Sequence, residues 1–240
     1  MKKLVLLLVT LLALIGCSNN LYEKLPDTER YKIANNYFDK GKYKRAIPIY
    51  ESIVSYKTSG ITSDAQAKLA ESYYLMGQYE NARLEYQFLM RYSSSLKDLE
   101  IAYFRIGECF WKTSEPAGYT QDETEAAISA MEEYLVRYPT GQYRLEANAI
   151  IKKAEEKLLE KTYLNGYTYF MLSDYPAALL YFDEVLAEGT KSEIDLKSAY
   201  YCAIIFYEQK NFERTDSFKQ YMQLSYPDAK LTKKISKKLK

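Results

Sequence analysis

Hydrophobic positions along the chain follow a repeated helical pattern, which is marked by pairs of adjacent aromatic residues. The pairs are Tyr37-Phe38, Tyr73-Tyr74, Phe110-Trp111, Tyr169-Phe170 and Phe206-Tyr207, and their first members lie 36, 37, 59 and 37 positions apart. A small residue stands three positions before each pair, at Ala34, Ala70, Gly107, Gly166 and Ala203. Because residues three and four apart share a helix face, this pattern predicts helices that approach closely at the small residues.

The segments between the predicted helices carry residues typical of tight turns. Gly41 and Gly77 stand where a left-handed helix end is expected. Asp174 is predicted to cap the helix that follows it, with Pro176 in the first turn of that helix. Pro48 falls several residues into a predicted helix and is expected to kink it.

The paired helices and their spacing resemble the tetratricopeptide repeat. The resemblance implies an all-α fold, a right-handed α-solenoid of about five helix-turn-helix repeats over residues 27–228. The units are expected at about 27–60, 63–96, 97–139, 143–190 and 192–228. The longer interval after the third pair contains the connection "KTSEPAGYTQDETE" and an extra helix, which is expected to continue into the first helix of the fourth unit.

The first segment has the pattern of a signal peptide, with Lys2 and Lys3 before an apolar run. Its end, Leu14-Ile15-Gly16-Cys17, resembles a bacterial lipobox, which implies cleavage after residue 16, acylation of Cys17 and a tether over residues 17–26. Ser18 after the cysteine implies sorting to the outer membrane. The alternative is an ordinary signal peptide that happens to contain a cysteine.

Composition and motifs indicate a binding protein and not an enzyme. Lys and Arg (33) balance Asp and Glu (32), so charge gives no argument for nucleic acid as a partner, and histidine is absent. Phosphate-loop, nucleophile-elbow and metal motifs are missing, so neither a metal nor a cofactor is expected beyond the lipid on Cys17. A glycosidase-type pair of catalytic carboxylates remains an alternative to this interpretation. Cys109 and Cys202 are predicted to be buried and too far apart for a disulfide.

A lipobox followed by five such repeats resembles the BamD family, the lipoprotein subunits of the outer-membrane β-barrel assembly machine. The likeness is strongest from Arg137-Tyr138-Pro139 through Gln142-Tyr143 into the fourth unit. It implies a periplasmic scaffold, held on the outer membrane by its lipid, that binds unfolded outer-membrane proteins and the barrel-forming assembly subunit. Units one and two lack the closing Tyr-Pro. This leaves open another envelope adaptor, of the Tol–Pal kind or an accessory to a peptidoglycan enzyme.

In tetratricopeptide repeats the concave face comes mainly from the first helix of each unit. Tyr37 is therefore expected to pack within its own helix pair, against Ala34 and Tyr50, and Phe38 to face the next unit and the groove. The candidate groove residues of units one to three are Tyr31, Asn35, Phe38, Glu71, Tyr74, Phe104, Glu108 and Trp111. Packing against the next helix is the competing explanation for each aromatic.

The chain ends in a lysine-rich segment, residues 229–240, in which Leu231, Ile235 and Leu239 recur every fourth position. This spacing is compatible with a basic amphipathic helix that touches anionic lipid or an acidic partner. The simpler interpretation, which we prefer, is a solvated end that keeps the last repeat soluble.

Overall fold

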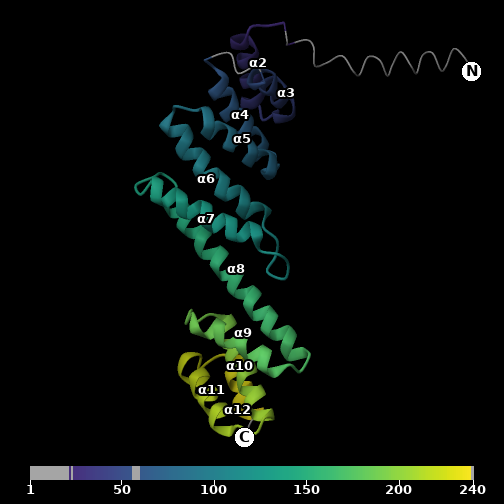
Figure 1. The fold of residues 1–240 in the computed structure, drawn as a ribbon, viewed down its shortest axis with the longest axis vertical. Helices are drawn as coiled ribbons and strands as arrows, with labels where there is room; N and C mark the ends of the chain where they lie inside the picture. The colour runs from purple at the N-terminus through teal and green to yellow at the C-terminus, as the bar shows by residue number, and fades with distance from the viewer. Residues whose placement is uncertain (1–21, 23, 56–59, 239–240) are drawn as a thin grey trace, which may run out of the picture. The chain divides into compact units, whose positions relative to one another are not determined.

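The structure is a computed structural model that describes residue 22 and residues 24–55 and 60–238, and all regular structure in these residues is helical (Figure 1). The predicted helix-turn-helix pattern is confirmed. Cys17 and the rest of the lipobox lie outside the described residues. The helices are α2 (Asp27–Asp39), α3 (Tyr43–Val54), α4 (Thr62–Leu75), α5 (Tyr79–Tyr92), α6 (Leu96–Thr113), α7 (Asp122–Arg137), α8 (Arg144–Met171), α9 (Tyr175–Ala187), α10 (Glu193–Glu208), α11 (Phe212–Ser225) and α12 (Lys230–Lys238).

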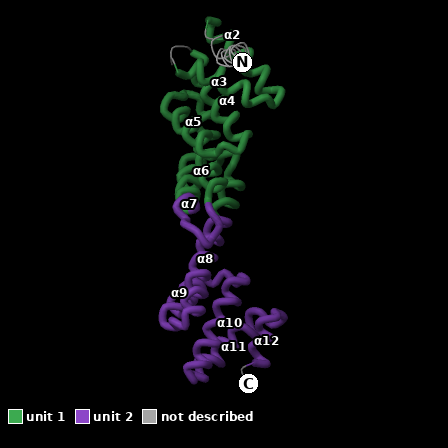
Figure 2. The backbone as a smooth tube through the Cα atoms, turned by 90° about the vertical axis from the view of Figure 1, so that its right-hand side faces the viewer, with its two compact units in different colours: residues 1–114, 125–151 green, residues 115–124, 152–240 purple. Residues whose placement is uncertain are grey.

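The helices divide into two compact units (Figure 2). Unit 1 comprises residues 1–114 and 125–151, and unit 2 comprises residues 115–124 and 152–240. Within unit 1, three hydrophobic clusters join α2–α4, α4–α6 and α6–α8 in turn. Within unit 2, two clusters join α8–α10 and α10–α12. Each helix pair therefore shares its core with the first helix of the next pair, as expected of stacked repeats.

The small residues allow close helix contact, as the sequence pattern predicts. All five are buried. A Cβ atom at Gly107 would lie 3.0 Å from Met131 Cε of α7, and one at Gly166 would lie 2.9 Å from Phe182 Cδ1 of α9. These separations are shorter than ordinary carbon contacts, so a side chain at Gly166 would displace the Phe182 ring and one at Gly107 would press on the Met131 side chain.

One turn position in four of the five repeats has a left-handed backbone. Gly41 and Gly77 have φ of 67° and 72°, which confirms the prediction for these glycines. The equivalent positions in later repeats are Ser173 and Lys210, with φ of 61° and 58°. The third repeat differs because Ser114 has φ of −66° and the chain continues into a longer connection.

Helix ends and one buried charge fix the local geometry of the repeats. Asp174 accepts a hydrogen bond from the backbone N–H of Ala177 at 3.3 Å, with proline in the first turn of α9, as predicted. The helix α3 continues through Pro48, whose side chain is exposed.

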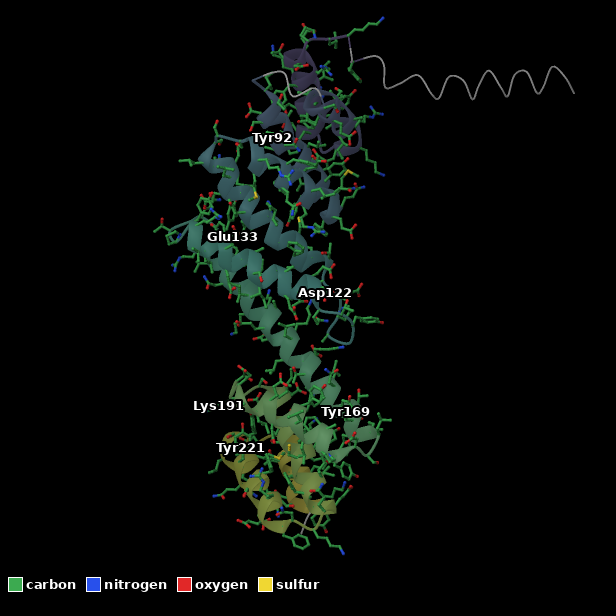
Figure 3. All side chains as sticks on the ribbon, viewed as in Figure 1. Tyr92, Asp122, Glu133, Tyr169, Lys191 and Tyr221 are labelled. Carbon is green, nitrogen blue, oxygen red and sulfur yellow. The ribbon has the colours of Figure 1, made fainter. Side chains whose placement is uncertain are left out.

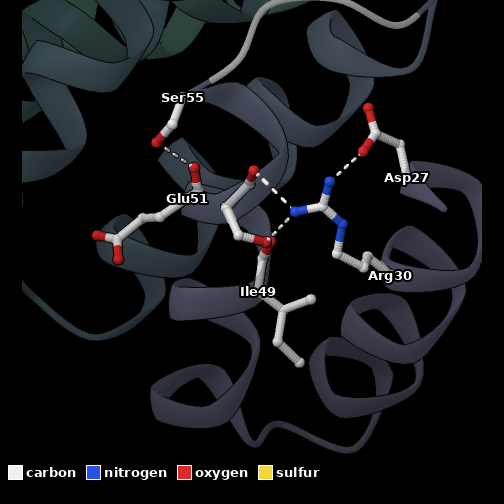
Figure 4. Close-up of polar contacts among 6 residues, drawn as sticks. Asp27, Arg30, Ile49, Glu51 and Ser55 are labelled. Carbon is white, nitrogen blue, oxygen red and sulfur yellow. Dashed lines mark hydrogen bonds and ion pairs between the residues drawn. The ribbon is translucent and has the colours of Figure 1, made fainter. Parts of the chain in front are cut away.

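Arg30 of α2 is a buried charge with polar partners on both helices of the first repeat. It donates to the carbonyl and hydroxyl oxygens of Ser52 on α3, both at 2.9 Å, and pairs with Asp27 (Figure 4).

The helix α8 is continuous from Arg144 to Met171, which confirms the predicted extension into the fourth repeat. Within unit 2, the connection 115–121 lies along α8. Lys157 Nζ donates to the carbonyl of Glu115 at 3.1 Å, and Lys161 Nζ donates to the carbonyl of Gly118 at 3.2 Å. The long connection thus has its own polar contacts with the helix.

The lysine-rich segment forms α12, which packs on the last repeat. Ile235 is fully buried, and Leu231 is half-buried against the α10–α11 cluster. Leu239 lies outside the described residues. One apolar face of α12 therefore covers the end of the repeats, and its lysines remain on the outside.

Cys109 and Cys202 are buried and free, as predicted. Burial raises the pKa of the Cys109 thiol to about 12 and also raises the pKa of the Cys202 thiol. A thiol in the unfolded chain ionises at lower pH than these buried thiols. Their contribution to the free energy of unfolding is therefore full below about pH 9 and is lost as the pH rises above that value.

We expect the free energy of unfolding to fall by about 1.5–2 kcal/mol per thiol between pH 8 and 10, on top of a fall from the buried tyrosines. Urea unfolding at the two pH values measures the change. The double variant Cys109→Ala and Cys202→Ala retains only the tyrosine contribution, so an unaltered pH dependence in this variant would contradict the prediction.

Candidate protein-binding face

The first helices of the three repeats in unit 1, α2, α4 and α6, carry the predicted groove residues at matching repeat positions. Asn35, Glu71 and Glu108 occupy one position, and Phe38, Tyr74 and Trp111 occupy another. All six side chains are half-buried. They are therefore held by neighbours but still present part of their surface.

The first of these positions is tied to a tyrosine on the second helix of the same repeat. Tyr50 Oη donates to Asn35 Oδ1 at 2.6 Å, and Tyr86 Oη donates to Glu71 Oε2 at 2.5 Å. Burial raises the pKa of both tyrosines, so both hydroxyls stay protonated and act as donors at neutral pH. These bonds fix the polar side chains at the face.

Arg105 of α6 joins the second and third repeats. Its guanidinium lies 2.6 Å from Glu108 Oε2 and 3.5 Å from Glu71 Oε1, and 4.1 Å from the centroid of the Tyr74 ring. Although burial disfavours its charge, Glu71 and Glu108 raise the pKa of Arg105. The result is a half-buried cluster in which a planar cation is held between two carboxylates and an aromatic ring.

Phe38 has an equivalent cation from the next repeat. Lys68 Nζ of α4 lies 4.2 Å from the centroid of the Phe38 ring. Phe38 also packs edge-on against Tyr43 at 5.3 Å, as Tyr74 does against Tyr79 at 5.5 Å. The second aromatic therefore contacts both the next repeat, as predicted, and the start of its own second helix, which the sequence analysis missed.

The first aromatic of the pair has different partners in the first and second repeats. Tyr37 contacts its own pair, with the Arg45 guanidinium 5.9 Å from its ring centroid. The ring that faces Tyr50, however, is that of Tyr31, at 6.1 Å. Tyr73 instead donates to Glu51 of the preceding repeat at 2.6 Å. In the second repeat, the first aromatic therefore contacts the second helix of the preceding repeat.

Phe104 is a correction to the predicted groove. It is only 3% exposed. Its ring stacks on Tyr143 at 4.4 Å with an interplanar angle of 10° and meets Tyr134 edge-on at 5.8 Å. Phe104 occupies the repeat position of Tyr31, which is half-buried in the first repeat. In the third repeat Tyr143, which precedes α8, covers this position, so Phe104 belongs to the core and not to a binding surface.

The face retained from the prediction therefore consists of Tyr31, Asn35, Phe38, Glu71, Tyr74, Glu108 and Trp111. The structure adds Lys68 and Arg105, which sequence reasoning missed. Lys68 follows Phe38 by 30 positions and Arg105 follows Tyr74 by 31. A basic residue at this repeated spacing was the sequence pattern that could have identified the two cations. We call these nine residues the α2–α4–α6 face.

A protein family described as outer membrane lipoprotein, YfiO, matches residues 23–208. The chain belongs to this family. The matched segment contains the whole α2–α4–α6 face, so the YfiO-type repeats and the candidate surface coincide along the chain. No protein of curated function matches the sequence.

Among solved structures, the TPR2AB-domain:pHSP90 complex of yeast Sti1 is similar to this YfiO-family chain at 16% identity and a TM-score of 0.46. The alignment covers 86% of this chain and 80% of that chain. Within the described part of the chain, no helix is both long and apolar enough to span a bilayer, and no three His, Cys, Asp or Glu side chains gather as metal ligands would.

Proposed function

We propose that this YfiO-family chain is a BamD-type scaffold, anchored to the periplasmic side of the outer membrane by acyl chains on Cys17. It assists the assembly and insertion of β-barrel proteins by binding their unfolded segments and the barrel-forming subunit. The observation that carries this proposal is the family match over residues 23–208. The repeat fold adds support, because stacked helical repeats commonly offer extended surfaces for peptide and protein binding.

The α2–α4–α6 face supplies the chemistry for the client segment. Strand signals of outer-membrane proteins carry alternating aromatic side chains. Half-buried rings at Phe38 and Tyr74, each beside a cation, give apolar contact at low entropic cost. Glu71 and Glu108 can accept hydrogen bonds from an extended backbone.

Crosslinking in intact membranes followed by affinity recovery of this chain tests the proposed partners. Recovery of the barrel-forming subunit and of unfolded outer-membrane proteins is the expected result. Recovery of a Pal-like lipoprotein or a peptidoglycan enzyme in their place would overturn the proposal and favour another envelope adaptor.

Replacing Cys17 with serine is expected to abolish membrane anchoring, since the acyl chains contribute about 0.8 kcal/mol for each buried methylene. Mass spectrometry of the chain from membranes should show acyl chains on Cys17 in the wild type, and none in the variant. After a high-salt wash, cell fractionation should recover the variant in the soluble fraction, because salt removes contacts that depend on charge but leaves an acyl anchor in place. A variant that stays with the washed membrane as fully as the wild type would contradict a lipid anchor at Cys17.

A further inference from the structure

The turn between α2 and α3 is a concentrated patch of positive charge in unit 1. Lys40, Lys42, Lys44 and Arg45 fall within six consecutive residues, and all four side chains are exposed. Among the described ion pairs, none includes Lys40, Lys42 or Lys44. The nearest acidic residue in sequence is Asp39, so the patch keeps a surplus of charge.

The patch surrounds a shallow pocket of about 460 Å³. The lining residues are Gly41, Lys42, Tyr43, Lys44, Arg45 and Met76. Met76 comes from the end of α4, where the adjacent Leu75 is 46% exposed. Cations and apolar groups are thus placed together, a combination that suits the boundary between lipid headgroups and acyl chains.

The lysines of α12 provide an internal comparison. Lys233 lies 3.6 Å from Asp228, and Lys234 Nζ lies 5.4 Å from the centroid of the Tyr200 ring. The apolar side of α12 is covered by the last repeat. The helix α12 carries five lysines, one basic residue more than the turn, but none of its described apolar residues, 230–238, is exposed beside them.

Chain length places the patch within reach of a membrane that holds Cys17. Ten residues separate the start of the mature chain from α2, and an extended chain of that length spans at most about 35 Å. The helix α2 adds about 20 Å of rise before the turn at Gly41. A tether of this length can therefore reach far enough to let the patch meet the lipid surface that holds Cys17.

We propose that the α2–α3 turn is a docking site for an anionic phospholipid surface, in which Lys40, Lys42, Lys44 and Arg45 contact lipid phosphates and Met76 faces the apolar boundary. This inference rests on the lipid anchor proposed for Cys17. It assigns the first repeat a second membrane contact that depends on charge and not on acylation.

The test uses the mature chain with Cys17→Ser, so that no acyl chain masks the contact. Co-sedimentation compares vesicles of phosphatidylcholine alone with vesicles that also contain phosphatidylglycerol. We expect binding to the anionic vesicles only, with loss at high salt. The triple variant Lys40→Gln, Lys42→Gln and Lys44→Gln should bind at least about tenfold more weakly, since each basic residue near an anionic surface contributes substantially.

The matched control is Lys230→Gln, Lys237→Gln and Lys238→Gln, which removes the same charge from α12 and should retain binding within about twofold. Equal loss in both variants, or equal binding to both kinds of vesicle, would overturn the proposal. Displacement by inorganic phosphate at constant ionic strength would also overturn it, by indicating a site for free anions. Circular dichroism verifies folding, and client-peptide binding tests the scaffold function separately.

Discussion

Replacing Phe182 with alanine is expected to destabilise the α8–α10 region of unit 2 by about 3–5 kcal/mol. Phe182 is fully buried and belongs to the hydrophobic cluster that joins α8, α9 and α10. Its ring stacks on Tyr201 at 5.7 Å, lies 6.0 Å from Tyr163, and fills the space opposite Gly166. Truncation leaves a cavity between helices that are held rigidly by their neighbours. Amide hydrogen exchange, resolved to peptides from α8, α9 and α10, measures the loss of protection.

Leu180→Ala is the matched control on the same helix. Leu180 is 69% exposed, so its removal is expected to change stability by less than about 0.5 kcal/mol. If Leu180→Ala exposed α8–α10 to exchange as much as Phe182→Ala does, the cost would stem from α9 in general and not from the buried ring.

A double variant, Phe38→Ser with Tyr74→Ser, is expected to weaken client binding at least about tenfold, because aromatic anchors dominate peptide interfaces. The probe is a synthetic peptide with the C-terminal strand sequence of an outer-membrane β-barrel protein, measured by fluorescence anisotropy. Both rings lie beside cations of the next repeat, so their loss removes two paired aromatic sites from the α2–α4–α6 face. Trp111 is left intact because it packs against the α6–α8 core.

The control for this prediction is Phe88→Ser with Tyr92→Ser on α5, which is the second helix of the second repeat. These aromatics are 40% and 58% exposed, and Figure 3 labels Tyr92. The pair should leave peptide affinity within about twofold, because α5 is not part of the proposed surface. Equal loss of affinity in both variants, or a loss of thermal stability in Phe38→Ser/Tyr74→Ser that matches its loss of affinity, would contradict a binding role for the face.

Local backbone constraints explain which parts of the fold could be predicted from the sequence. Gly41 and Gly77 occupy a left-handed turn position that favours glycine, and the small residue before each aromatic pair marks helix contact. Ser173 and Lys210 adopt the same left-handed conformation but carry no local signal. Only their alignment with the glycines of earlier repeats identifies them.

Contacts between helices explain what could not be predicted. Tyr86 bonds to Glu71, Tyr73 to Glu51 and Tyr134 to Glu100, so tyrosine recurs as a ring that packs and a hydroxyl that binds a surface carboxylate. Such bonds join residues 15 to 34 positions apart in the chain. Phe104 was assigned to the groove for a related reason: repeat register alone does not reveal that Tyr143 stacks over it.

The position of Trp111 in α6 gives the molecule a spectroscopic asymmetry. It is the only tryptophan in the sequence, and it belongs to unit 1. Tryptophan emission therefore reports the melting of unit 1, whereas far-ultraviolet circular dichroism reports helices in both units. Coincident curves would indicate one cooperative transition, and separated curves would give the stability of each unit without any added label.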